Sequence, residues 1–198
     1  MTTLNLFFFI FTLLFAASAF ATTTTSTNSF IQSKCSSTTY PSLCVQSLST
    51  FANKIHESPR QLAQTALIMS LSKARYAKTC IAHLVSSGQL RPRDLGPLKD
   101  CLEVIGDSVD RLSMAVHEFQ AATRAHSTDF LWHMSNVQTW ASAALTDENT
   151  CVDGFEGPNR DRSIQNEVKA QFEGVMQCTS NALCLVNEFV NQYTPRNS

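Results

Sequence analysis

The chain has little glycine and proline and no excess of charge of either sign. Its 198 residues include 6 glycines and 6 prolines, fewer than the turns of a β-sandwich require, so the composition favours a helical protein. Lysine and arginine number 15 against 16 aspartates and glutamates, which gives a net charge of −1. That balance excludes binding to nucleic acid or to an anionic membrane through bulk charge.

Motifs of catalysis and cofactor binding are also missing. The sequence has no Gly-x-Ser-x-Gly or His-Glu-x-x-His motif, no phosphate-binding loop and no glycine-rich dinucleotide fingerprint. Its cysteines form no Cys-x-x-Cys pair, which is the usual half of a zinc site. We therefore expect a protein that is not an enzyme and that binds no metal and no cofactor.

A long apolar run occurs only at the N-terminus. Residues 4–15 are almost continuously apolar, and the small residues of a cleavage site follow at Ala19 and Ala21. The run is shorter than the roughly 20 residues that cross a bilayer, and no basic flank follows it. Residues 1–21 are therefore predicted to be a signal peptide, cleaved after Ala19 or Ala21, so that the mature chain is secreted and not membrane-bound. The Thr/Ser tract of residues 22–29 is predicted to be a flexible leader.

Four long segments repeat apolar residues every three or four positions, the period of an amphipathic helix. They reach from Ser58 to Val85, from Leu98 to Phe119, from Ser127 to Leu145 and from Ser163 to Phe189. Ser58, which a proline follows, and Ser163 are the expected N-caps of the first and the fourth helix. Each has one apolar face, and short links favour antiparallel neighbours. The pattern predicts an all-α fold, an up-down-up-down antiparallel four-helix bundle over residues 58–194. A short hairpin over residues 30–57 precedes it, and residues 30–198 form a single domain.

Seven cysteines in a secreted chain indicate disulfides. Cys35 and Cys44 flank a Tyr-Pro turn signal, so a bridge between them would close the N-terminal hairpin. If the second and third helices are antiparallel about a turn near residue 124, Cys101 and Cys151 lie almost equally far from it and face each other. We predict these two bridges. Three buried free thiols remain, at Cys80, Cys178 and Cys184.

Four motifs, in this order, resemble those of the plant invertase and pectin methylesterase inhibitor family. They are Cys35 with Tyr40-Pro41-Ser42-Leu43-Cys44, then Leu98-Lys99-Asp100-Cys101-Leu102-Glu103, then the stretch from Val137 to Phe155 around Trp140-Ala141-Ser142-Ala143-Ala144-Leu145, and last Ser180-Asn181-Ala182-Leu183. The resemblance covers essentially the whole mature sequence. It implies a helical hairpin docked on a disulfide-tied four-helix bundle, in agreement with the pattern of the residues.

The resemblance also implies a function. The Trp140 stretch is more like the branch that inhibits pectin methylesterase, and the Pro-Lys-Phe tripeptide typical of acid invertase inhibitors is absent. The expected protein is a monomer that is secreted to the apoplast and cell wall. There it covers the pectin-binding cleft of a pectin methylesterase in a one-to-one, non-covalent complex. The alternative partner is an acid invertase.

Two acidic clusters are candidates for the partner-binding surface. Glu103, Asp107 and Asp110 are spaced to share one face of the second helix. The second cluster is predicted to lie in the loop after the third helix and comprises Asp147, Glu148, Asp153 and Glu156, with Thr150 among them. In the family's Thr-Cys-x-Asp motif the Thr and Asp are implied contacts to the esterase, and here they are Thr150 and Asp153. Either cluster can instead be a solvated surface.

Aromatic residues are expected mostly in the core. Phe119, Phe172 and Phe189 fall on the apolar faces and are predicted to be buried. Trp132 and Trp140 are either interface anchors or core residues, and the core is the commoner place for an aromatic residue on an amphipathic helix.

Overall fold

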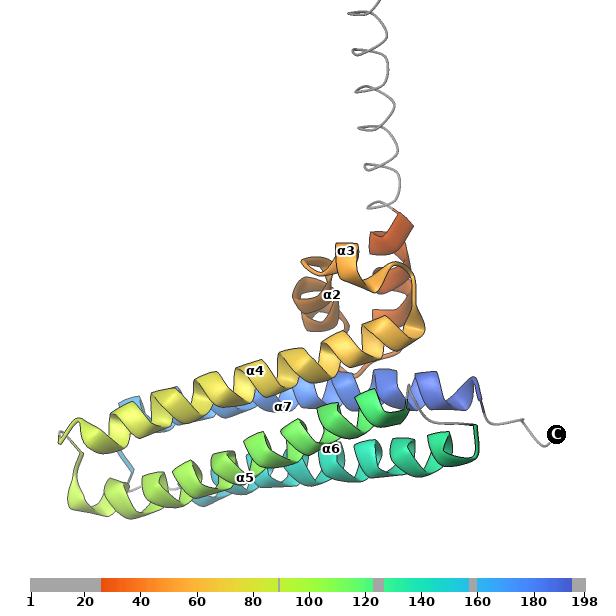
Figure 1. Ribbon diagram of the computed structural model, residues 1–198. Helices are drawn as coiled ribbons and strands as arrows, with labels where there is room; N and C mark the ends of the chain where they lie inside the picture. The colour runs from red at the N-terminus through yellow and green to blue at the C-terminus, as the bar shows by residue number, and fades with distance from the viewer. Residues whose placement is uncertain (1–25, 89, 123–126, 157–159, 194–198) are drawn as a thin grey trace, which may run out of the picture.

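The molecule is built from helices that pack side by side. The structure, a computed structural model, describes residues 26–88, 90–122, 127–156 and 160–193, and all regular structure within them is helical. Four long helices follow one another along the chain: α4 (Pro59–Ser86), α5 (Pro92–Ala122), α6 (Ser127–Phe155) and α7 (Arg162–Asn191). Each packs against its predecessor, and α7 closes the bundle against α4 (Figure 1). The predicted all-α, up-down-up-down four-helix bundle is confirmed.

A short helical segment precedes the bundle and lies beside one end of α4 and α7 (Figure 1). It consists of the helical residues 26–35, α2 (Pro41–Ser49) and α3 (Ala52–Ile55). The predicted disulfide between Cys35 and Cys44 is present and holds the first helical stretch to α2, with the two Cα atoms 5.6 Å apart. The segment therefore has the hairpin character that the sequence predicts.

The predicted flexible leader differs from the structure where the structure describes it. Residues 26–29 are already helical, Thr27 is buried, and the Ser26 hydroxyl donates a hydrogen bond to the carboxylate of Glu57. These small polar side chains pack against the hairpin, a role that a tract without large apolar residues does not reveal. Residues 1–25, with the expected signal peptide, lie outside the described residues. No described helix combines the length and the apolar character needed to cross a membrane.

Capping residues fix where two of the long helices begin. Ser58 caps α4 as predicted, because its hydroxyl accepts a hydrogen bond from the amide of Gln61 at 3.3 Å. The expected cap of α7 at Ser163 is wrong. The carboxylate of Asp161 accepts bonds from the amides of Ser163 and Ile164 at 2.9 and 3.4 Å, so α7 begins two residues earlier than predicted.

α5 tolerates a proline near its start because another side chain replaces the missing helix bond. Pro97 has no amide hydrogen to donate to the carbonyl of Arg93, four residues earlier. The guanidinium of Arg160, from the segment before α7, donates to that carbonyl at 2.6 Å. This contact also ties the end of the bundle where α5 begins to the start of α7.

α6 is longer than the sequence predicts. Its apolar pattern was expected to end near Leu145 and give way to an acidic loop, but the helix continues to Phe155. Ala144, Glu148, Cys151 and Phe155 are all buried at helical spacing. The buried stripe therefore runs through a glutamate, which interrupts the apolar pattern in the sequence but not the helix.

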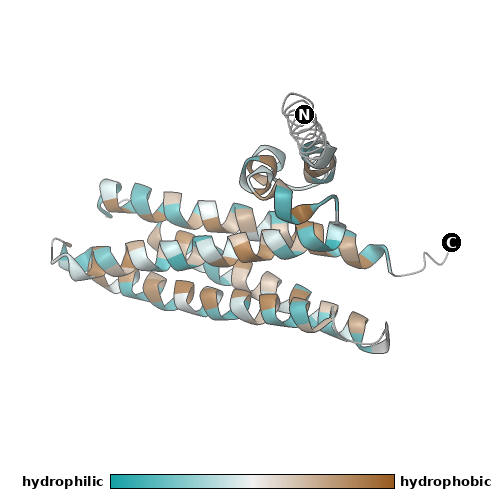
Figure 2. Ribbon diagram, turned by 45° about the horizontal axis from the view of Figure 1, so that its top comes forward, coloured by the Kyte–Doolittle hydropathy of each residue, from teal (hydrophilic) through white to brown (hydrophobic). Residues whose placement is uncertain are grey.

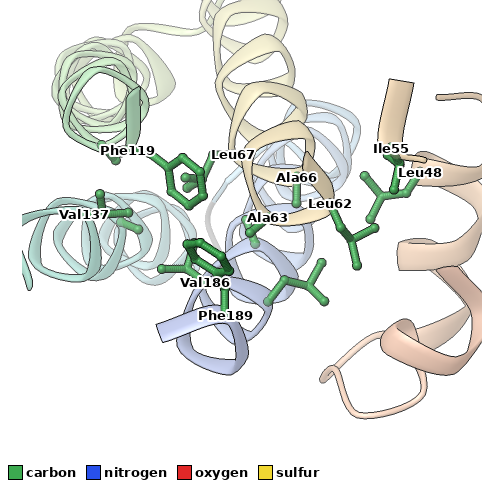
Figure 3. Close-up of a cluster of buried hydrophobic side chains, with 14 of the residues drawn as sticks. Leu48, Ile55, Leu62, Ala63, Ala66, Leu67, Phe119, Val137, Val186 and Phe189 are labelled. Carbon is green, nitrogen blue, oxygen red and sulfur yellow. The ribbon is translucent and has the colours of Figure 1, made fainter. Parts of the chain in front are cut away.

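The apolar stripes of the helices meet in two buried clusters, one at each half of the bundle. Figure 2 shows apolar and polar residues at helical spacing along each long helix. At the hairpin end, Leu48 of α2 and Ile55 of α3 join Leu62 of α4 in the same cluster as Phe119 and Phe189 (Figure 3). The hairpin thus extends the core of the bundle and does not form a core of its own.

The aromatic residues follow the prediction in part. Phe119, Phe172 and Phe189 are at most 3% exposed, so their core positions are confirmed. Trp132 is 60% exposed, because it points away from the buried side of α6, and a core position for it is wrong. Trp140 is half-buried at the seam between α5 and α6.

The remaining cysteines divide into one bridge and three free thiols. Cys101 of α5 and Cys151 of α6 form the predicted disulfide, with their Cα atoms 4.9 Å apart. Cys178 is a buried thiol, as expected. Cys80 and Cys184 are only half-buried, because each lies at the flank of its helix's buried stripe and not within it.

Candidate functional site

The acidic residues of α5 form one exposed row. Glu103, Asp107 and Asp110 are all exposed. The buried residues of the same stretch, among them Ile105 and Leu112, point to the opposite side of the helix. The row therefore faces solvent along the middle of a rigid helix.

Thr150 and Asp153 lie on the neighbouring helix, α6. Both are exposed, and the Thr150 hydroxyl donates to the carbonyl of Thr146 at 2.8 Å, which orients the side chain against its own helix. The Cys101–Cys151 disulfide holds this part of α6 to the part of α5 that carries Glu103. We use the name α5–α6 face for the exposed residues that the structure brings onto these two helices: Glu103, Asp107, Asp110, Thr150 and Asp153.

Asp147 does not belong to this face. It is nearly buried and forms an ion pair with Arg111 of α5, whose Nε lies 2.9 Å from the carboxylate. Burial is the largest influence and raises the pKa of Asp147; Arg111 opposes the rise and nearby Asp107 adds to it. Asp147 therefore closes the seam between α5 and α6 and is committed to a contact within the bundle.

Glu148 lies in the interior of the bundle and not on its surface. Its side chain is fully buried, and one carboxylate oxygen accepts hydrogen bonds from Ser108 of α5 at 2.7 Å and Thr179 of α7 at 3.1 Å. Its other oxygen accepts no hydrogen bond from the described residues. Burial raises the pKa of Glu148 to about 8, although both hydroxyls favour the charged form. The predicted acidic loop is therefore a helix with two of its carboxylates turned inward.

A groove beside the acidic row was missed by the sequence analysis. It has a volume of about 510 Å³, lies between α5 and α6, and is open to solvent. Its lining residues are Asp110, Ser113, Met114, His117, Glu118 and Trp140. Met114 follows Asp110 by four residues and is 38% exposed, so an apolar residue on the polar stripe of α5 was the signal in the sequence.

The exposed groups lie on helices that are joined by ion pairs between side chains. Within the described ranges, no group of three histidine, cysteine, aspartate or glutamate side chains is placed to hold a metal ion. His133, at the edge of α6, is engaged by Glu118 at 2.7 Å, which joins α6 to α5. The α5–α6 face therefore offers carboxylates, a hydroxyl and a neighbouring aromatic residue on two helices that are cross-linked to each other.

Comparisons with known proteins agree with the fold and the motifs. A family model described as plant invertase/pectin methylesterase inhibitor matches residues 29–185. The chain is 46% identical to pectinesterase inhibitor 11 of Arabidopsis thaliana, over 83% of this chain and 82% of that protein. It is 48% identical to pectinesterase inhibitor 9 of the same plant, over 82% of this chain and 81% of that protein.

A solved structure has the same architecture. The crystal structure of mutant form A of a pectin methylesterase inhibitor from Arabidopsis superimposes with a TM-score of 0.62, over 77% of this chain and 92% of that chain. The two sequences are 21% identical over this match, so the likeness is one of fold.

Proposed function

The chain belongs to the plant invertase/pectin methylesterase inhibitor family, and from that premise we propose that it is a secreted inhibitor of a pectin methylesterase. The inhibitor acts as a monomer that binds the enzyme in a one-to-one, non-covalent complex and covers its pectin-binding cleft. In the cell wall this limits the removal of methyl esters from pectin. No group of the inhibitor needs to react.

The α5–α6 face is the observation that supports this proposal. A cleft that receives the carboxylates of a partly de-esterified pectin is at least partly basic, so exposed carboxylates on another protein compete for it. The face lies on two long helices joined by the Cys101–Cys151 disulfide, so its charges are pre-positioned and little order is lost on binding. A stable complex of this kind buries roughly 1,600 Å², which two helices and their flanks can supply.

The groove beside Asp110 supplies the apolar part of such an interface. Trp140 and Met114 line it, next to the acidic row of α5. Aromatic residues in partly closed pockets commonly carry much of the binding free energy at interfaces, while surrounding charges set orientation and association rate. We propose that a side chain of the esterase enters this groove.

An acid invertase is the alternative partner, since the family includes inhibitors of both enzymes. The absence of Pro-Lys-Phe favours the esterase. The deciding experiment titrates the secreted protein, with its disulfides intact, against a purified plant pectin methylesterase and a purified acid invertase side by side. Stoichiometric inhibition of the esterase alone supports the proposal, and inhibition of the invertase alone overturns it.

The contribution of Thr150 and Asp153 is testable by substitution. We expect the double variant Thr150→Ala/Asp153→Ala to raise the inhibition constant for the esterase tenfold or more, equivalent to about 1.4 kcal/mol, because it removes a charge and a hydroxyl from the α5–α6 face. The matched control is Thr79→Ala/Glu167→Ala, which removes an exposed threonine and an exposed carboxylate from α4 and α7. Equal inhibition constants for the two double variants would contradict the assignment.

A further inference from the structure

α4 carries charge of only one sign. Over its 28 residues it has no aspartate or glutamate, and its cations are Arg60, Lys73, Arg75 and Lys78. The last three lie within about 8 Å along the helix axis. In the part of the chain that the structure describes, none of these three forms an ion pair. A run of unpaired positive charge therefore lies along the middle of one helix.

The ammonium groups of Lys73 and Lys78 each pack over a glycine of a neighbouring helix. A β-carbon at Gly106 of α5 would lie 3.3 Å from Nζ of Lys78, and one at Gly174 of α7 would lie 3.2 Å from Nζ of Lys73. The two ammonium groups therefore rest in the seams on opposite sides of α4, where the missing side chains leave room. Between them, Tyr76 is 65% exposed at the crest of the helix.

Acidic residues next to these glycines are engaged elsewhere. Glu173, which precedes Gly174, pairs with Lys169 on its own helix at 3.6 Å. Asp107, which follows Gly106, lies close enough to Asp147 of α6 to raise the pKa of that carboxyl, which places it toward the side of α5 away from α4. Glu103 and Asp110 lie three residues before and four residues after Gly106, on the same side of α5. In the described residues, none of these four carboxylates forms an ion pair with a cation of α4.

We propose that Lys73, Arg75, Tyr76 and Lys78, the α4 basic face, bind an anionic polyuronate, the de-esterified form of pectin. This inference rests on the proposed function in one respect, that the protein works where an esterase exposes carboxylates on pectin. α4 packs against α5 and α7 and lies diagonally across the bundle from α6 (Figure 1). The inhibitor can thus hold the polymer with α4 while the α5–α6 face holds the enzyme.

The chemistry of the face fits a chain of acidic sugars. Arginine and lysine donate charge-assisted hydrogen bonds to carboxylates, and the tyrosine ring offers a flat apolar surface with a polar tip. Each exposed charge pair is worth little by itself, so affinity comes from several pairs along the repeating polymer. A net charge of −1 opposes accumulation on polyanions in general, so binding depends on this local face and weakens as salt is added.

The test measures binding of the full secreted protein to polygalacturonate, without esterase, by isothermal titration calorimetry at low ionic strength. Polyglutamate of equal charge and fully methyl-esterified pectin are the comparison polymers. We expect binding to polygalacturonate only, and at least tenfold weaker binding for Lys73→Ala/Arg75→Ala/Lys78→Ala. The matched control Lys54→Ala/Lys99→Ala/Arg162→Ala removes three exposed cations from elsewhere and should bind within twofold of the unchanged protein.

Three outcomes overturn the inference: no binding to polygalacturonate, equal binding to polyglutamate, or equal loss in the two triple variants. Tyr76→Ala is the second variant and should weaken binding to polygalacturonate severalfold while circular dichroism shows an unchanged helical fold.

The esterase is assayed separately with a short methyl ester substrate, which the α4 basic face does not touch. Inhibition there should be the same for the triple variant and the unchanged protein. For the unchanged protein, inhibition without polymer binding contradicts this inference alone, whereas polymer binding without inhibition contradicts the proposed function alone.

Discussion

Glu148 places an ionisable group inside the bundle and so makes stability depend on pH. Burial raises its pKa from an ordinary value of 4.5 to about 8, so the folded protein keeps a proton that the unfolded chain loses. Where the unfolded state binds fewer protons, stability falls as pH rises. The contribution of Glu148 to the free energy of unfolding is therefore most favourable below about pH 4.5, and it is lost progressively as the pH rises to about 8.

The first stability prediction replaces this carboxyl by an amide. Glu148→Gln keeps an oxygen to accept from Ser108 and Thr179 but cannot ionise, so its stability should change less between pH 4.5 and 8. We expect the variant to be more stable than the unchanged protein by a few kcal/mol at pH 8 and similar to it at pH 4, measured by urea unfolding. Glu156→Gln, at an exposed carboxyl, is the control. Parallel pH profiles for Glu148→Gln and the unchanged protein would sink this account.

At the scale of single residues, the sequence placed some candidates well and others wrongly. Glu103, Asp107 and Asp110 were predicted to share an exposed face, and all three are exposed on α5. Asp147 and Glu148 were assigned to the surface because they are charged. Their partners, Arg111 for the first and Thr179 for the second, are far away in the chain and carry no local signal.

At the scale of elements, the start of α4 was predicted correctly, the cap of α7 was not, and α6 was predicted too short. The Ser58 cap with the proline after it was read correctly, because a cap acts on amides two or three residues away. The end of α6 at Phe155 was not, because the helix continues through Glu148, whose burial is decided by α5 and α7. A cap can be predicted from neighbouring residues in the sequence, whereas the burial of a side chain depends on how other helices pack against it.

A buried side chain of α7 adds hydrogen bonds to the apolar contacts that join the hairpin to the bundle. Asn181 is 4% exposed; its amide oxygen accepts from the Tyr40 amide at 2.9 Å, and its amide nitrogen donates to the Tyr40 carbonyl at 2.9 Å. Tyr40 precedes α2 and has no side-chain cap of its own. Asn181 therefore pairs, from another helix, with both backbone polar groups of the residue that precedes α2.

Replacing this side chain should loosen the hairpin and leave the bundle intact. Asn181→Leu leaves the Tyr40 amide without its partner, at a cost of about 2 kcal/mol. We expect faster amide hydrogen exchange in α2 and α3 and unchanged exchange in the middle of α5, measured by mass spectrometry. The control Asn187→Leu, also on α7, removes an exposed hydrogen bond from Gln138 of α6 and should leave exchange in both regions unchanged. Uniformly faster exchange in Asn181→Leu would count against a local role.

At the scale of the whole molecule, the topology followed from the sequence, and the distribution of charge did not. Four amphipathic segments with short links determine the bundle, and the spacing of Cys101 and Cys151 about one turn predicts their bridge. A net charge of −1 hides a separation of charge between an acidic α5–α6 face and a basic α4. That separation appears only when the helices are placed around a common core.

The two disulfides close loops of different length, so removing each one should have a different effect on stability and on inhibition. Cys101–Cys151 closes a loop of 50 residues and Cys35–Cys44 one of 9. Chain entropy assigns them about 4 and about 2.6 kcal/mol respectively. In urea unfolding, Cys101→Ala/Cys151→Ala should therefore lower the midpoint more than Cys35→Ala/Cys44→Ala. It alone should weaken esterase inhibition, because it removes the covalent link that fixes Thr150 and Asp153 of α6 relative to α5. The reverse order of midpoints, or equal inhibition by both variants while folded, would show that the tether between α5 and α6 does not position the face.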